Sequence, residues 1–336
     1  MRDVGTRSFR QGDLPAAADL YDRVLAPMRP RYSWPLSVQR FQRQYLGHPE
    51  FREDGLFVAE KGGRIVGFAF GALRMDPITP EDTLPGVFVS LLLVDEPERR
   101  RGIGTALLER VAEFGGQHGK TLLSAHANPM SPLALWPGVN RNWADAVAFL
   151  RHHGFVAEHT EVSMEQKISG FAFSEYVRNR QERFSQGGFR VVRYQPRWRD
   201  ALLALSGSPF WHLDLLSKIE RLEHPFIETA FLNLALDSIY GPEDVTLLVR
   251  GDELAGFVVL CRNPGEKISY LGPIRVAEKY QHGGLGSWMI QQALLWERLR
   301  GVEAVDLWCS QDNARRFYAH NGFVQCETWD LYERPL

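Results

Sequence analysis

The chain has 336 residues, of which 44% are hydrophobic and 24% charged, as in an ordinary globular protein. Its 39 basic and 41 acidic residues nearly cancel, which argues against binding nucleic acid through phosphate contacts or a membrane surface through basic patches. The length favours two domains.

Neither a membrane span nor a secretory leader is expected. No apolar run of about 18 residues occurs, and the N-terminus lacks the apolar core of a signal peptide. Cys261 and Cys309 lie in or at the end of apolar runs, and with Cys326 they make an odd number. This indicates reduced thiols and a cytoplasmic protein. A metal site is not expected, because the sequence contains neither a Cys-x-x-Cys nor a His-x-x-x-His spacing.

The first half begins with a helix and a hairpin. Asp13 is placed to cap a helix. The apolar face of that helix consists of Ala17, Leu20, Tyr21 and Val24. Apolar runs at 56–60 and 65–70 surround a glycine turn, which is typical of an antiparallel hairpin.

A strand, a glycine loop and a helix come next. The apolar run 87–94 is followed by Arg99-x-x-Gly102-x-Gly104 and then by residues at helical spacing. The helical face consists of Ile103, Leu107, Val111 and Phe114. A further strand at 122–126 and a short helix at 145–150 lead to Gly154-Phe155.

The same elements recur in the second half, in the same order. The matching segments are a hairpin of 245–249 and 254–260, a strand at 268–276, a loop at 281–286, a helix carrying Leu285, Met289, Ala293 and Trp296, a strand at 304–309, a helix at 313–318 and Gly322-Phe323. We therefore expect two tandem α/β (α+β) domains, each a mixed, mostly antiparallel sheet flanked by helices.

The spacing between the copies locates an insertion. The loops lie 182 residues apart (Gly102 to Gly284) and the Gly-Phe pairs 168 apart (Gly154 to Gly322). The first copy thus holds 14 extra residues, around 128–143, in a proline-containing loop. We assign residues 1–168 to the first domain, the polar segment 169–188 to a linker, and 189–336 to the second domain.

The two glycine loops are suited to an anion. Glycines let the backbone approach a ligand, and the free N–H groups at a helix N-terminus favour a diphosphate. A Walker loop would need Gly-Lys-Ser or Gly-Lys-Thr, which is absent. A dinucleotide fingerprint would need a third glycine where Leu107 and Met289 stand.

At these loops the sequence resembles the GNAT superfamily of acetyltransferases. The family's Gln/Arg-x-x-Gly-x-Gly/Ala signature is matched by Arg99 to Gly104 and by Gln281 to Gly286. Its later motif, Asn-Ala followed by Phe-Tyr-x-x-x-Gly-Phe, is matched by Asn313 to Phe323. The likeness covers about 8–168 and 189–334. The tandem arrangement is similar to mycothiol synthase, although architecture does not transfer a substrate.

The resemblance implies acetyl-CoA as cofactor, with its diphosphate on the loops, its pantetheine arm beside the fourth strand of each domain, and a contact to Asn313. The implied cofactor residues are Leu92, Val94, Arg99, Arg100, Arg101, Gly102, Ile103, Gly104 and Thr105 in the first copy, and Ile274, Val276, Gln281, His282, Gly283, Gly284, Leu285, Gly286, Ser287 and Asn313 in the second.

Tyr318 is the residue that the resemblance puts near the thioester sulfur. Transfer of an acyl group to an amine is helped by a proton for the leaving thiolate, which a phenol can give. The first copy has Leu150 at this position and Asp145 where the second has Asn313. We therefore expect the first domain to bind coenzyme A yet to be catalytically weak, and the second to be catalytic.

The acceptor is expected to be a small-molecule primary amine. The general base is not identified by any motif; Glu228, Asp214 and His212 lie where such domains build acceptor sites. Two other functions stay open at this stage, namely acetylation of a protein N-terminus or lysine, and acyl-CoA binding without catalysis. A monomer and a homodimer are both compatible with the sequence, with neither nucleic acid nor a membrane as partner.

Overall fold

The computed structural model describes residues 4–25, 52–73, 85–125, 137–207, 241–262, 267–309 and 311–336, with a few isolated positions between them. Its described residues divide into two compact units. None of the described helices is both long and apolar enough to cross a membrane.

The first unit is built mainly from the first half of the chain. Its strands are β1 (Val4–Ser8), β2 (Leu56–Lys61), β3 (Arg64–Leu73), β4 (Gly86–Val94), β5 (Leu122–Ala125) and the short β6 (Val139–Asn140). Its helices are α1 (Leu14–Leu25), α3 (Ile103–Gln117) and α4 (Ala144–His152).

The second unit repeats this plan. Its strands are β8 (Phe189–Arg193), β9 (Val245–Arg250), β10 (Glu253–Arg262), β11 (Ile268–Val276) and β12 (Ala304–Cys309), and its helices are α5 (Glu175–Gln186), α6 (Arg199–Ser206), α9 (Leu285–Leu299) and α10 (Asp312–His320). In both units the pairs β4–β5 and β11–β12 are parallel and the neighbouring pairs are antiparallel. The expected mixed, mostly antiparallel sheets are confirmed.

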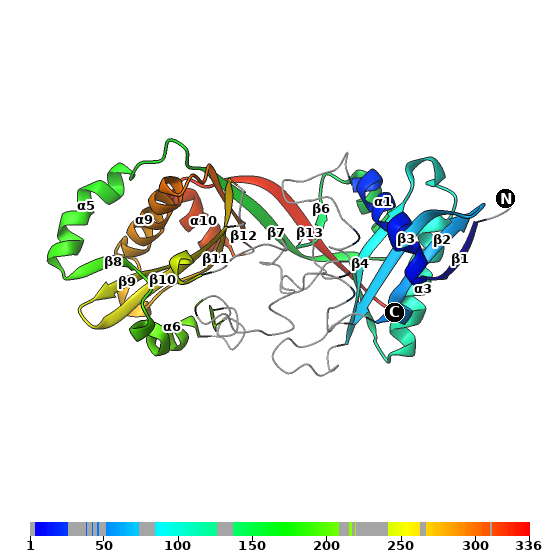
Figure 1. Ribbon diagram of the computed structural model, residues 1–336, viewed down its shortest axis with the longest axis horizontal. Helices are drawn as coiled ribbons and strands as arrows, with labels where there is room; N and C mark the ends of the chain where they lie inside the picture. Colours follow the sequence, from blue (N-terminus) through cyan, green and yellow to red (C-terminus); the bar gives the residue numbers. More distant parts are fainter. Residues whose placement is uncertain are drawn as a thin grey trace. The chain divides into compact units, whose positions relative to one another are not determined.

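The last strand of each repeat is exchanged. β7 (Val156–Lys167) follows α4 of the first unit but pairs with β12 of the second, with Val162 opposite Cys309. β13 (Val324–Pro335) follows α10 of the second unit but pairs with β5 of the first, with Tyr332 opposite Ala125. Figure 1 shows both as long ribbons. The sheet orders are therefore β1-β2-β3-β4-β5-β13 and β8-β9-β10-β11-β12-β7.

This exchange changes which residues make up each unit. Trp329–Leu336 belongs with the first unit, and the described residues between Val162 and Thr328 belong with the second. The consecutive blocks 1–168 and 189–336 assigned from the sequence differ from these units at both exchanged strands. The physical reason is that an alternating strand offers the same edges to either sheet, so its own pattern does not select a partner.

Apolar side chains cover both faces of the first sheet. On one face α1 buries Ala17, Leu20, Tyr21 and Val24, the face expected for that helix. The other face is covered by α3 and α4, whose apolar residues join Leu123 and Phe155 in a second cluster. Asp13 does not cap α1, because its carboxylate accepts instead from the Arg10 N–H at 2.7 Å and from Arg7.

The segment expected to be a linker holds a helix packed on the second unit. Ser174 caps α5 by accepting a hydrogen bond from the Val177 N–H. The Ser174 N–H donates to buried Gln291 of α9 at 2.9 Å, and Phe184 stacks on Trp288 with ring centroids 5.5 Å apart. In Figure 1, α5 accordingly lies beside α9. The segment is thus ordered by burial of one side of a polar helix.

Of the three cysteines, Cys261 and Cys309 are buried, as expected from their apolar runs, whereas Cys326 is exposed. None of the three is joined in a disulfide.

The second unit contains a buried cluster of charged side chains. Arg300 donates to Asp244 at 2.9 Å and to Glu297 at 2.7 Å, and the Ser269 hydroxyl donates to Glu297 at 2.6 Å. Both carboxylates are at most 1% exposed. Burial raises the pKa of Asp244 to about 6, even though Arg300 acts in the opposite direction.

This pKa predicts a pH-dependent stability. Between pH 3.8 and about 6 the folded state holds a proton on Asp244 more tightly than the unfolded state does. The stabilising contribution of this group is therefore full below pH 3.8 and lost as the pH rises through 6. The difference between these two pKa values corresponds to about 3 kcal/mol. We expect the free energy of unfolding of the native chain, minus that of Asp244→Asn, to fall by about 3 kcal/mol between pH 4 and 7. Denaturant titrations across that range test it; a difference that is flat or rises with pH contradicts it.

Candidate functional site

The two glycine loops have the same backbone conformation. Each follows a single turn of 3-10 helix, Glu96–Glu98 or Glu278–Tyr280. The angle φ is then positive at two alternate residues, 62° at Arg100 and 82° at Gly102 in the first loop, and 63° at His282 and 91° at Gly284 in the second. Positive φ outside glycine is uncommon, so its occurrence at both Arg100 and His282 shows a conformation that the fold imposes.

This conformation turns the backbone N–H groups toward one side. The first bond inside α3 runs from the Ala106 N–H to the Gly102 carbonyl at 3.0 Å, and its equivalent in α9 from Trp288 to Gly284 at 3.1 Å. The N–H groups of the three residues between therefore have no acceptor within their helix. With the helix dipole they form a concave donor surface for an anion.

The first residue of each motif fixes the loop to the strand that precedes it. Arg99 donates through Nε to the Val94 carbonyl at 3.2 Å, and Gln281 donates through Nε2 to the Val276 carbonyl at 2.8 Å. Of the other two arginines in the first loop, Arg101 pairs with Glu98 at 3.2 Å, whereas Arg100 is exposed. Arg99 and Arg101 are thus engaged in holding the loop itself.

Beside each loop two parallel strands separate. β4 pairs with β5 only from Gly86 to Phe88, and β11 pairs with β12 only from Ile268 to Tyr270. Both β4 and β11 then continue to the loop, paired on their other side with β3 or β10 through an irregular register. The separating strands leave backbone groups of β4 and β11 available to an extended ligand.

The residues expected beside such a ligand lie along these free stretches. Leu92 and Val94 of β4 are half-buried and alternate with buried neighbours, whereas Ile274 and Val276 of β11 are half-buried on either side of exposed Arg275. Each loop and its strand end therefore lie together within one unit.

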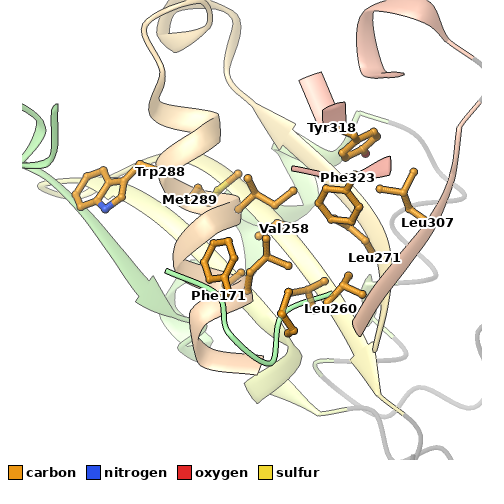
Figure 2. Close-up of a cluster of buried hydrophobic side chains, with 14 of the residues drawn as sticks. Phe171, Val258, Leu260, Leu271, Trp288, Met289, Leu307, Tyr318 and Phe323 are labelled. Atoms are coloured by element: carbon orange, nitrogen blue, oxygen red, sulfur yellow. The ribbon is translucent and has the colours of Figure 1, made fainter. Parts of the chain in front are cut away.

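Tyr318 lies on α10 inside the apolar core of the second unit. Its side chain is 7% exposed, and its ring meets Phe323 edge-on at 5.7 Å. Figure 2 shows it beside Phe323 and Leu307. Burial, with a smaller effect of Cys309, raises the pKa of Tyr318 well above its usual range, so the phenol stays protonated. Leu150, 5% exposed, has the same place on α4.

Three further residues expected to contact the cofactor are Asn313, Thr105 and Ser287. Asn313 is exposed in the first turn of α10, where its Oδ1 accepts from the Ala314 N–H at 2.8 Å. Thr105 lies 3.1 Å from Nε2 of His153, and Ser287 is buried. Burial is the main cause that lowers the pKa of His153.

Tyr176 borders the second loop and was not among the expected residues. A Cβ added to Gly284 would lie 2.7 Å from its hydroxyl, so this phenol closes one side of the loop. Its ring meets His320 of α10 edge-on at 4.9 Å and carries the Arg180 guanidinium 3.9 Å above it. Tyr176 belongs to α5, outside both repeats, so the repeat signal could not find it; only the Ser174 cap marked a helix there.

The three candidate bases, His212, Asp214 and Glu228, lie outside the described residues. At the first loop, what the structure describes fits coenzyme A, whereas at the second the Tyr176 hydroxyl lies beside Gly284. A Cβ on Gly102 would meet nothing within 4 Å, so the space over the first loop is open, and the strands separate beside it.

The comparisons with known proteins agree with this geometry. The model of the acetyltransferase (GNAT) family matches residues 18–131 and 211–323, which together exceed half of the chain. An L-2,4-diaminobutyric acid acetyltransferase of Nocardia farcinica is 40% identical over 78 residues, 23% of this chain and 37% of that protein. An uncharacterized N-acetyltransferase of Methanocaldococcus jannaschii is 31% identical over 103 residues, 31% of this chain and 39% of its own. The chain thus spans under two-fifths of either curated relative.

Solved structures share the whole fold at low identity. A glucosamine N-acetyltransferase region of a fungal multi-domain β-N-acetylglucosaminidase has a TM-score of 0.71 at 17% identity, over 99% of this chain and 38% of that one. A tandem GNAT protein from the clavulanic acid biosynthesis pathway has a TM-score of 0.65 at 16% identity, over 99% and 98%.

Two family matches in one chain, each containing one of the two loops, agree with the duplicated strand, loop and helix described above. The chain therefore belongs to the GNAT acetyltransferase family and has its tandem-domain form.

Proposed function

We propose that this protein is an acyl-CoA-dependent N-acetyltransferase, that it transfers acetyl from acetyl-CoA to a primary amine of a small molecule, and that the second unit catalyses this transfer with Tyr318 as general acid. The observation that carries the proposal is the coincidence, in each unit, of an anion-binding loop with a pair of separating strands.

The binding part of the proposal follows from that coincidence. The diphosphate of coenzyme A would accept hydrogen bonds from the N–H groups at the start of α3 or α9. The arm would pair with the free edge of β4 or β11 beyond Phe88 or Tyr270, where the neighbouring strand has separated. Bound acetyl-CoA supplies an activated thioester.

Groups of the chain itself would donate a proton to the leaving thiolate and stabilise the developing negative charge. The Tyr318 hydroxyl is held in a dry environment and keeps its proton, as a donor to a leaving thiolate must. An N–H on the free edge of β11 can donate to the oxygen that becomes negative during transfer. The amine must arrive unprotonated, and an ordinary alkylamine with a pKa near about 10.4 needs a base for this at neutral pH.

A small amine is the favoured acceptor. The Nocardia relative is named for acetylation of diaminobutyric acid, a small molecule with primary amines. The near-neutral charge of the chain supplies no general attraction for a charged protein partner.

Calorimetric titration with coenzyme A tests the binding part. We expect two sites per chain, one of which is lost in Gly102→Val and the other in Gly284→Val, because a side chain there enters the loop. Gly119→Val and Gly301→Val are the matched controls. They have similar positive φ values, 69° and 86°, and open surroundings at the far ends of the same helices.

In the same chains a thermal shift should accompany binding. Coenzyme A at 100 times its dissociation constant stabilises a one-site unit by about 2.7 kcal/mol. Thiol release from acetyl-CoA with a panel of small amines and of peptides then reports the acceptor. Binding without release on any acceptor would favour a non-catalytic acyl-CoA-binding protein, and release on peptides alone a protein acetyltransferase. The absence of binding at any concentration would refute the proposal.

A further inference from the structure

The first unit lacks a phenol on the helix that carries Tyr318 in the second. Leu150 occupies that place on α4, four residues before Gly154-Phe155, as Tyr318 stands four residues before Gly322-Phe323. Both side chains are buried in the apolar cluster beneath their helix. The first repeat of the sequence therefore supplies no proton donor at the position that Tyr318 occupies in the second.

The exchanged strand brings a phenol into the same cluster. Tyr332 of β13 lies opposite Ala125 of β5, and it is buried with Leu150 and Phe155. The equivalent pair in the second unit is Met164 opposite Leu307, and Met164 is buried with Tyr318. The two units thus hold the same pair of side-chain types in reversed positions, with an aliphatic side chain on the helix and a phenol on the strand in the first, and the converse in the second.

The hydroxyl of Tyr332 has no hydrogen-bond partner among the residues that the structure describes, and the side chain is only 1% exposed. A buried hydroxyl without a partner is costly, and most buried polar groups in proteins have one. Nearby Ser124 shows the usual behaviour, since its hydroxyl donates to Glu333 at 3.0 Å. An unpaired phenol in this position indicates a partner that arrives with a ligand.

The position of Tyr332 is next to the point where the strands separate. The last paired residue of β5 is Ser124, and Ala125, which faces Tyr332 across the β5–β13 ladder, is the first beyond it. The phenol shares its cluster with residues of α3 and α4 and with half-buried Leu92 of β4. It therefore lies on the face of the sheet that α3 and α4 cover, one strand away from the gap between β4 and β5.

We propose that Tyr332, from the C-terminal strand, is the proton donor of a second acyl-transfer site in the first unit. This rests on the proposed function. The acceptor nitrogen forms the new C–N bond as the C–S bond breaks and leaves its electron pair on sulfur. The Tyr332 hydroxyl gives its proton to that sulfur, and the phenolate recovers the proton that the acceptor nitrogen loses. The first unit is then active despite Leu150.

A binding comparison tests the contact to sulfur without turnover. In the Gly284→Val chain, in which only the first loop is open, we expect coenzyme A to bind about fivefold more tightly than desulfo-coenzyme A, as for an ordinary hydrogen bond. Tyr332→Phe should abolish this preference and leave the affinity for desulfo-coenzyme A unchanged. A preference that survives Tyr332→Phe, or a first loop that binds neither ligand, overturns the inference. A native chain that binds no coenzyme A at all refutes the proposed function instead.

Turnover gives the second test in the same Gly284→Val chain. With acetyl-CoA and the amine panel, Tyr332→Phe should lower the rate of thiol release at least about tenfold. Leu150→Tyr added to Tyr332→Phe should restore part of it, since the phenol is returned to the helix. Because the hydroxyl is unpaired, the melting temperature of Tyr332→Phe should be equal or higher. Tyr21→Phe, buried on the other face of the same sheet, is the control. An unchanged rate, or no release above the uncatalysed reaction before the substitution, overturns the inference.

Discussion

Trp329→Ala should destabilise the first unit by about 3–5 kcal/mol, although Trp329 belongs to the second repeat of the sequence. Its side chain is fully buried in β13, and its ring meets Trp143 of the first unit edge-on at 5.7 Å. Truncation to alanine leaves a large cavity in the sheet that β13 completes. The unit that loses stability is therefore decided by strand exchange and not by sequence order.

Met164→Ala is the matched variant for the other exchanged strand. Met164 is 3% exposed in β7 and packs in the core of the second unit, although it belongs to the first repeat. The expected loss is about 2–5 kcal/mol, in the second unit.

Hydrogen exchange followed by mass spectrometry separates the two effects, because amide protection reports local stability. Trp329→Ala should speed exchange in peptides of β2 and β3, and Met164→Ala in peptides of β9 and β10. If Trp329→Ala instead affects only β9 and β10, the strand pairing described for β13 is wrong.

The parts of the fold that the sequence predicted are those with a local signal. The hairpins were predicted by two apolar runs around a glycine turn, and β4, its loop and α3 by a change from strand to helical spacing at Gly102. The repetition of these signals at a constant offset predicted the second copy. Each signal depends on residues close together in the chain, which is why it is readable without a structure.

The exchanged strands have no such signal. Met164 and Tyr332 occupy equivalent positions in strands of the same length, and either side chain would be buried in either sheet. The choice of partner is a tertiary effect, and so is the consequence that a phenol of the second repeat reaches the first unit. Tyr176 was missed for a similar reason, since its contact with Gly284 depends on how α5 packs on α9.

Tyr318→Phe should lower turnover of the second unit at least about tenfold, the lower end of what a general acid contributes, with little change in affinity for acetyl-CoA. The Gly102→Val chain is the one to use, because its remaining turnover comes from the second unit alone. Phenylalanine keeps the ring contact with Phe323 and removes only the hydroxyl. Single-turnover thiol release together with titration of coenzyme A separates the two quantities.

The raised pKa of Tyr318 constrains how it acts. A phenol that holds its proton more tightly than a thiol, whose pKa is about 8.5, cannot simply be deprotonated by a free thiolate, so transfer must accompany cleavage of the C–S bond. In this dry site the hydrogen bond to the developing charge is strengthened. Turnover should therefore keep rising with pH as the amine loses its proton, with no fall caused by Tyr318 below about pH 10.

Moving the phenol gives the strongest check of this role. Tyr318→Leu with Met164→Tyr reproduces in the second unit the arrangement that the first unit has with Leu150 and Tyr332. If a phenol at either position can reach the sulfur, this double variant should recover part of the rate that Tyr318→Leu loses. If Tyr318→Phe leaves the rate unchanged, no phenol is needed, and the general acid must be sought elsewhere in the unit.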